Sequence, residues 1–196
     1  MGYRFILASA SPRRRELLKQ IGVTFEVMPA KGEEVITERQ PEQVVKELSR
    51  QKAEEIAAGI QGEHVIILGA DTVVAYDGKI LGKPKDETDA RRMLSMLSGN
   101  THSVYTGVTV IVLKDGESQI HSFYEETKVT MYPMTDAQIF AYIQTKEPMD
   151  KAGAYGIQGK GAVFIEKIDG DYNNVVGLPL AKIFHKIEEV WGFAIA

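Results

Sequence analysis

The sequence predicts an α/β or α+β fold built on a mixed β-sheet with flanking helices. A long apolar run, VIILGADTVVAY at residues 65–76, is the strongest strand signal in the chain. Two alternating segments, residues 102–113 and 119–132, flank Lys114-Asp115-Gly116 and are typical of an antiparallel hairpin. Amphipathic helical patterns are interleaved with these strands, so helices and strands both contribute to the fold.

The first part of the chain predicts a strand, a helix and a second strand. Residues 4–9 (RFILAS) form a continuous apolar run that is typical of a buried strand. Ser11 then takes the N-cap position, Pro12 the first helical position and Gly22 the position just past the helix. Residues 24–28 (TFEVM) are expected to form the second strand.

The later elements follow the same rules of periodicity and capping. A helix begins at Pro41, another covers about residues 87–97, and Thr135 with Gln138 forms a capping box for a third. The remaining predicted elements are a hairpin strand at 79–84 after the turn Asp77-Gly78, a glycine-rich segment at 146–161, a strand at 162–170 and a helix at 179–191.

Length and composition limit the class of protein. With 196 residues, the chain is expected to form a single domain over residues 1–196, with two small lobes sharing a cleft as the alternative. A net charge of -4 gives no general attraction to nucleic acid. The absence of cysteine excludes disulfides, thiolate zinc sites and a cysteine nucleophile. We expect a cytoplasmic protein, because neither a membrane-spanning run nor an export signal is seen.

Arginines open the helix that follows the first strand. Arg13, Arg14 and Arg15 fall in its first turn, where unpaired N–H groups and the helix dipole favour anions. Each cation there costs about a few tenths of a kcal/mol, and a bound phosphate would reverse that cost. Solvation, or pairing with surface acids, is the alternative. Both interpretations stay open on the residues alone.

A second group of candidates surrounds the strongest strand. Asp71 follows its apolar half, and a buried carboxylate needs a partner or a metal, although capping of a local turn is the alternative. Lys83 lies on the hairpin that follows, and the next residue, a proline, holds it extended. Glu33 and Glu34 could bind a hard cation together with Asp71. An exposed lysine and a solvated loop are the simpler interpretations of these residues.

The glycine-rich segment and the histidines carry no recognisable motif by themselves. Residues 150–162 contain neither a GxGxxG pattern leading into a helix nor a Walker A sequence. Their glycines therefore either form turns or belong to a binding loop. The histidines show no metal-binding spacing, and nothing supports a Ser-His-Asp triad.

A set of motifs occurs in a fixed order over nearly the whole chain. They are LASASPRRRELL, the glutamates at 33 and 34, QKA at 51–53, GADTVV, LGKP, SG at 98–99, KEPMDKAGAYGIQG and DGDYNNVVGLPL. This set resembles the Maf family of nucleoside triphosphate pyrophosphatases. The resemblance implies a mixed, twisted sheet with flanking helices and two lobes around a central cleft, similar to inosine triphosphate pyrophosphatases. It also implies a homodimer.

The resemblance implies hydrolysis of a nucleoside triphosphate between the α and β phosphorus, with Mg²⁺ or Mn²⁺ as cofactor. It assigns Asp71 as the general base or the activator of a metal-linked water. Glu34 would share the metal with Asp71, and Lys52 and Lys83 would complete the polar site. Glu34 is preferred over Glu33, although the residues just before them depart from the family's commoner acidic run. The phosphate-binding residues that the resemblance implies are Ser11, Arg13 and Arg14.

Three positions indicate a branch of the family. The branch that acts on dTTP and UTP has the residues found here at Arg13, Thr72 and Gln158, whereas the branch that acts on 7-methyl-GTP tends to have Trp, Gln and Glu. The resemblance therefore implies a dTTP/UTP pyrophosphatase that removes unwanted nucleotides from the pool. The alternative is a nucleotide-binding regulator of septum formation with little hydrolysis, and the intact acids and lysines argue against it.

Overall fold

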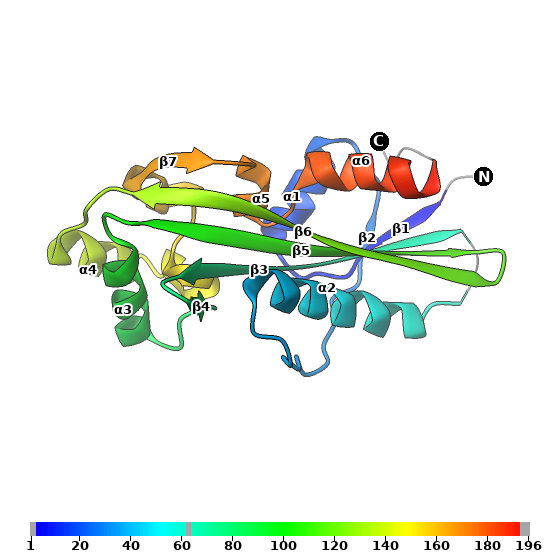
Figure 1. Cartoon of the computed structure of the whole chain (residues 1–196), viewed down its shortest axis with the longest axis horizontal. Coiled ribbons are helices and arrows are strands. Elements are labelled where there is room, and N and C mark those ends of the chain that lie inside the picture. The colour runs from blue at the N-terminus through cyan, green and yellow to red at the C-terminus, as the bar shows by residue number, and fades with distance from the viewer. Residues whose placement is uncertain (1–2, 62–63, 193–196) are drawn as a thin grey trace. The chain divides into compact units, whose positions relative to one another are not determined.

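The computed structural model describes residues 3–61 and 64–192 (Figure 1). Its described strands form a seven-stranded sheet in the order β2-β1-β3-β5-β6-β7, with β4 paired to β3 outside this path. β1 is parallel to β2 and β3, whereas β4 is antiparallel to β3 and β7 is antiparallel to β6. The predicted mixed α/β class is confirmed. The strands are β1 Arg4–Leu7, β2 Glu26–Val27, β3 Val65–Tyr76, β4 Lys79–Leu81, β5 Thr101–Lys114, β6 Glu117–Met131 and β7 Ile165–Asp169.

Helices are interleaved with the strands along the chain. In residues 3–61 and 64–192, no helix is long and apolar enough to cross a membrane. The α-helices are α1 Pro12–Gln20, α2 Pro41–Ala58, α3 Glu87–Leu97, α4 Asp136–Gln144, α5 Tyr172–Val176 and α6 Leu180–Trp191. The 3₁₀ helices are η1 Glu147–Asp150, η2 Ala152–Ala154 and η3 Gly159–Phe164.

The chain divides into two compact units. Unit 1 comprises Met1–Asp71, Thr106–Glu125 and Gly177–Ala196, and unit 2 comprises Thr72–Tyr105 and Glu126–Val176. Each of β3, β5 and β6 contributes residues to both units. The single domain expected over residues 1–196 stays a prediction.

Unit 1 buries apolar residues of β1, β3 and β5 against α2. Figure 1 shows α2 and α6 on opposite sides of the strands of this unit. At the start of α1, the Ser11 hydroxyl accepts a hydrogen bond from the Arg14 amide, and Pro12 is the first helical residue. Gly22, with φ +78°, follows the helix in the left-handed conformation that favours glycine. The predicted caps of this helix are confirmed. Core residues of unit 1 include Ile6, Ala8, Ala53, Val65, Ile67 and Ile111.

Unit 2 has its own apolar core, which joins α3 and α4 to the strands. The capping box predicted at Thr135 and Gln138 is present, because each side chain bonds the backbone of the other residue. Both predicted hairpin turns are also confirmed. Asp77-Gly78 and Asp115-Gly116, the latter in unit 1, have positive φ at both residues, as tight two-residue hairpin turns require. Buried residues of the unit 2 core include Val74, Leu94, Leu97, Met131, Ile143 and Tyr155.

Several elements differ from the sequence-based expectation. The strands predicted at 24–28 and 79–84 cover only Glu26–Val27 and Lys79–Leu81. The strand predicted at 162–170 begins only at Ile165, because the preceding residues form the 3₁₀ helix η3. Helix α5 was not predicted, since it has only 5 residues and too few turns to show helical periodicity. Its Asn174 is fully buried and donates to the Val104 carbonyl and the Thr127 hydroxyl. This tertiary contact, which lies within unit 2, has no local sequence signal.

Unit 2 also buries a histidine. His102 is 3% exposed, and its Nε2 lies 2.7 Å from the hydroxyl of the buried Tyr155. Within the described residues its Nδ1 has no hydrogen-bond partner. Burial lowers the pKa of His102 to about 4, from an ordinary value of 6.5. The imidazole is therefore neutral in the folded protein at pH 7.

We expect the protein to lose stability as the pH falls from 6.5 towards 4. In this range the unfolded chain protonates His102 and the folded chain does not, so the free energy of unfolding falls by up to about 3 kcal/mol. Urea unfolding at several pH values measures this loss. His102→Gln retains a polar partner for Tyr155 without titrating, so its curve should be flatter; parallel curves for the two proteins would contradict the assignment.

Candidate active site

The charged cluster of unit 1 is centred on Lys52, a residue of α2. Its ammonium nitrogen Nζ lies 2.5 Å from Asp71 Oδ1 and 2.9 Å from Glu34 Oε1. The side chains of Lys52 and Asp71 are only 18% and 15% exposed, whereas that of Glu34 is 51% exposed. The structure thus brings together three of the residues implied by the family resemblance. In the following, the charged cluster means these three residues and Arg14.

Asp71 lies within β3. The residues from Val65 to Ala70 are all buried, and from Asp71 onwards the strand alternates between buried and partly exposed pairs. The carboxylate thus stands where the strand first gains access to solvent. Because β3 continues to Tyr76, Asp71 does not cap a turn, and that alternative interpretation is wrong.

Arg14 is a buried cation in the first turn of α1. Its Nε donates to the Gly177 carbonyl at 2.8 Å, and its Nη1 donates to Ser9 Oγ at 3.0 Å. Burial lowers the pKa of this guanidinium, while the negative charge of Asp71 and then that of Glu34 raise it. The positive charge of Arg13 acts in the same direction as burial. Arg14 therefore experiences the electrostatic field of both carboxylates in the cluster.

The other arginines of this turn have different surroundings. Arg15 donates to the Ala10 carbonyl at 3.2 Å, and Arg13 is half-buried. The first turn of α1 contains no acidic residue. The positive potential of this helix start is therefore offset from outside the helix, by the carboxylates of the charged cluster, and Ser11 at its N-cap accepts a hydrogen bond from the Arg14 amide. An anion at this end of α1 would be stabilised.

The loop that carries Glu34 is fastened to α2 by side chains that sequence reasoning missed. Gln51 accepts from the Val35 amide at 3.0 Å and donates to the Val35 carbonyl at 2.5 Å. Glu55 accepts from the amides of Lys31 and Gly32, which lowers its pKa. Since the loop is held on both sides of Glu34, its carboxylate stays near Lys52. Glu33 is exposed.

Sequence reasoning also missed Ser9. Its hydroxyl oxygen accepts hydrogen bonds from the Arg14 guanidinium and from the Ser11 amide, so it joins β1 to the start of α1. The available sequence signals were a polar residue at the end of an apolar strand and, on α2, the spacing of Glu47, Gln51 and Glu55 every four residues. Both signals also fit an ordinary solvated surface.

Helix α2 lies in direct backbone contact with β3 and β5, both drawn beside it in Figure 1. A Cβ on Gly69 would stand 2.3 Å from the Ser49 carbonyl oxygen, and one on Gly107 would stand 2.1 Å from the Val45 carbonyl oxygen. Only glycine permits this approach. Gly69 lies two residues before Asp71 on β3. The close approach at Gly69 therefore sets how near α2, which carries Lys52, lies to the strand that carries Asp71.

The remaining residues implied by the resemblance belong to unit 2. Thr72 follows Asp71 on β3 and is partly exposed. Lys83 lies just after β4 and is exposed, and Gln158 is partly exposed at the residue before η3. Gly82, beside Lys83, accepts a hydrogen bond from Gly153 of the glycine-rich segment at 3.0 Å. The roles of these residues stay predictions.

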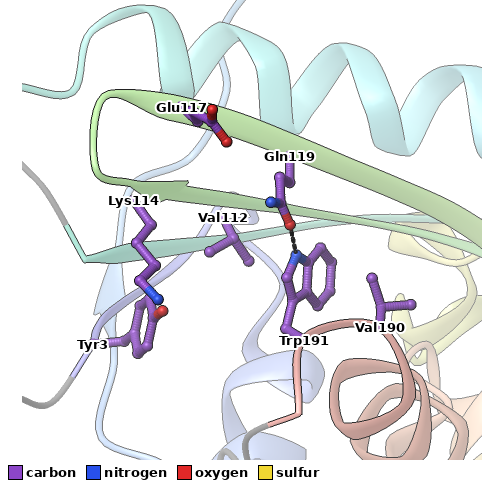
Figure 2. A pocket seen from close by; sticks show the side chains of 7 residues that line it. All are labelled: Tyr3, Val112, Lys114, Glu117, Gln119, Val190 and Trp191. Carbon is purple, nitrogen blue, oxygen red and sulfur yellow. Dashed lines mark hydrogen bonds between the residues drawn. The ribbon is translucent and has the colours of Figure 1, made fainter.

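A pocket in unit 1 contains none of the predicted residues. Figure 2 shows it at the tip of the β5–β6 hairpin, beside the end of α6, with Tyr3, Lys114, Glu117 and Trp191 in its lining. The Trp191 indole donates to Gln119 at 2.7 Å. The charged cluster is thus separate from this pocket, and its assignment rests on chemistry and not on cavity shape.

Comparisons with known proteins give a family match, similar sequences and a solved structure. A sequence model for the family described as Maf-like protein matches residues 4–190. An Agathobacter rectalis protein named dTTP/UTP pyrophosphatase is 58% identical over 199 residues, covering 95% of this chain and 97% of that protein. A protein of the same name from Carboxydothermus hydrogenoformans is 52% identical over 190 residues, covering 97% and 100%. Among solved structures, a nucleoside-triphosphatase/dITP/XTP pyrophosphatase from Mycobacterium abscessus aligns over 96% of this chain and 97% of that one, with 14% identity and a TM-score of 0.44.

Proposed function

This chain belongs to the Maf-like protein family, and from that premise we propose that it hydrolyses dTTP and UTP to the nucleoside monophosphate and pyrophosphate. Two relatives that cover nearly the full chain carry the name dTTP/UTP pyrophosphatase. The observation that carries the proposal is the contact of Lys52 with both Asp71 and Glu34 beside the buried cation Arg14. The role that fits this activity is to remove unwanted pyrimidine nucleotides from the nucleotide pool.

The charged cluster suits attack of water on a phosphoanhydride. As the water oxygen bonds to the α phosphorus, the bond to the bridging oxygen breaks and pyrophosphate leaves with the electron pair. Asp71 accepts the proton of the water, as a general base must. Negative charge grows on the leaving group, and Lys52 with the positive start of α1 stabilises it.

A divalent metal is part of the proposal. Mg²⁺ commonly binds one or two carboxylates together with phosphate oxygens and water. Asp71 and Glu34 supply two carboxylates, which lie close together because both contact the ammonium group of Lys52. Within the described ranges, no group of three or more histidine or acidic side chains is arranged to hold a metal. These donors thus fit a metal that the substrate helps to bind. Such a metal would offset phosphate charge and lower the pKa of a bound water.

We expect pyrophosphate release from dTTP and UTP to require added Mg²⁺ or Mn²⁺. Two acids alone bind Mg²⁺ weakly, so chelation by EDTA should abolish turnover and excess metal should restore it. Quantification of pyrophosphate across the common nucleoside triphosphates tests both the reaction and its base preference. Binding of dTTP without release of pyrophosphate at any metal concentration would instead favour a nucleotide-binding regulator.

Base selection is assigned in this proposal to Arg13, Thr72 and Gln158, the positions that indicate the pyrimidine branch. The Gln158 amide offers both a donor and an acceptor, which matches the edge of a pyrimidine. A hydrogen-bonding site rejects a wrong base strongly, because a mismatch leaves buried polar groups unpaired.

The proposal also includes a cytoplasmic location and a homodimer. Light scattering after gel filtration tests the dimer.

A further inference from the structure

The backbone around Gln158 is held by a carboxylate from the 3₁₀ helix η1. Glu147, the first residue of η1, accepts a hydrogen bond at Oε2 from the Lys160 amide, at 2.9 Å. Its Oε1 accepts from the Gly161 amide at 3.0 Å. Both bonds lie within unit 2 and fasten the segment just after Gln158.

A phenol from α4 holds the other side of the segment. The Tyr142 hydroxyl donates to Glu147 Oε1 at 2.9 Å and accepts from the Gly156 amide at 3.1 Å. Tyr142 is 3% exposed, and its ring packs edge-on against Phe164. Tyr142 and Glu147, called here the Tyr–Glu pair, thus contact the chain two residues before and two to three residues after Gln158.

The segment packs on the Tyr–Glu pair without a gap. A Cβ on Gly159 would lie 2.8 Å from Glu147 Oε2, and φ +71° at this residue also favours glycine. A Cβ on Gly161 would lie 2.5 Å from the Tyr142 hydroxyl oxygen and 2.3 Å from the Gly156 carbonyl oxygen. The glycines of this segment therefore serve close packing against the Tyr–Glu pair.

The charge state of Glu147 fits this task. Partial burial raises its pKa, but hydrogen bonds from the Lys160 and Gly161 amides and from Tyr142, with the charge of Lys151, more than offset this and lower the pKa overall. An ionised carboxylate only accepts hydrogen bonds. Glu147 can therefore accept from the Lys160 amide, the Gly161 amide and the Tyr142 hydroxyl at the same time.

Gln158 itself contributes nothing to this fastening. Its side chain makes no capping hydrogen bond at the start of η3. It is half-buried. The position of its amide therefore depends on the backbone of the segment, which the Tyr–Glu pair holds.

We propose that Glu147 and Tyr142 are positioning residues that set the base selectivity of the protein by fixing the backbone around Gln158. The inference rests on the proposed function in one respect, since it takes Gln158 as the residue that reads the base. Neither residue of the pair is assigned a contact with the substrate.

The test compares binding of two non-hydrolysable nucleotides, the α,β-imido analogues of dUTP and dATP, by calorimetry. In the native protein the dUTP analogue should bind more tightly. Glu147→Gln places an amide NH₂ among backbone donors. We expect the ratio of the dissociation constant of the dATP analogue to that of the dUTP analogue to fall by about tenfold. Tyr142→Phe, which preserves core packing, should change the ratio in the same direction. Glu166→Gln, an exposed site on β7, is the matched control and should leave the ratio unchanged.

A double variant separates positioning from general loosening of the fold. If the pair acts through Gln158, Glu147→Gln added to Gln158→Ala should change the ratio little further. An unchanged ratio in Glu147→Gln, an additive effect in the double variant, or equal weakening of both analogues would each overturn the inference. Equal binding of both analogues by the native protein would overturn it as well. Because binding is measured without turnover, a native protein that releases no pyrophosphate refutes the proposed function independently.

Discussion

Asp71→Asn is expected to lower the rate of pyrophosphate release from dTTP by about 10³-fold, the scale of a lost general base. The amide has nearly the shape of the carboxylate but cannot accept the proton of the attacking water at neutral pH. It also removes one of the two acids beside Lys52. Steady-state turnover at saturating dTTP and metal measures the loss. Circular dichroism and thermal unfolding should show a folded protein, because Glu34 still pairs with Lys52.

The matched control is Asp77→Asn in the turn between β3 and β4. Asp77 has φ +50°, a conformation that Asn also adopts readily, so the same chemical change should leave turnover and stability near their native values. Turnover in Asp71→Asn above about a tenth of the native rate would contradict the role of Asp71 as the base, because general-base catalysis contributes at least about 10²-fold.

Gly69→Ala is expected to lower both stability and turnover by moving α2. The new Cβ would stand 2.3 Å from the Ser49 carbonyl oxygen and 2.9 Å from Ala53 Cβ, so helix and strand must separate. Such overpacking costs about 3 kcal/mol of unfolding free energy. The movement also draws Lys52 away from Asp71, so turnover of the folded protein should fall. Urea unfolding and turnover at a temperature where the variant remains folded measure the two effects.

The control for this substitution lies on the same helix. Gly59 ends α2 with φ -95°, and a Cβ there would meet nothing closer than 3.7 Å, so Gly59→Ala should be neutral or slightly stabilising. Gly107→Ala, which meets the Val45 carbonyl oxygen at 2.1 Å, should reproduce the loss. A free energy of unfolding within about 0.5 kcal/mol of the native value in Gly69→Ala would show that α2 is not held by this contact.

Local signals of the sequence predicted most elements of the fold. The cap at Ser11, the capping box at Thr135 and the hairpin turns at Asp77-Gly78 and Asp115-Gly116 were all predicted and are all present. Each depends on bonds or dihedral angles among residues within about four positions, which the order of residue types specifies. Membership in the Maf-like family, expected from the resemblance, is confirmed by the comparisons.

The sequence by itself therefore determined the mixed α/β class, most helices and strands, the family and the residue types of the candidate site. Only the tertiary structure decided that Lys52 contacts both Glu34 and Asp71, that Gln51 and Ser9 support the cluster, and that Glu147 holds the segment of Gln158. These contacts join residues 5 to 19 positions apart, and their geometry depends on how closely α2 approaches the sheet and on how one loop packs. A single sequence encodes such distances only through the packing of the whole chain, so no local pattern reveals them.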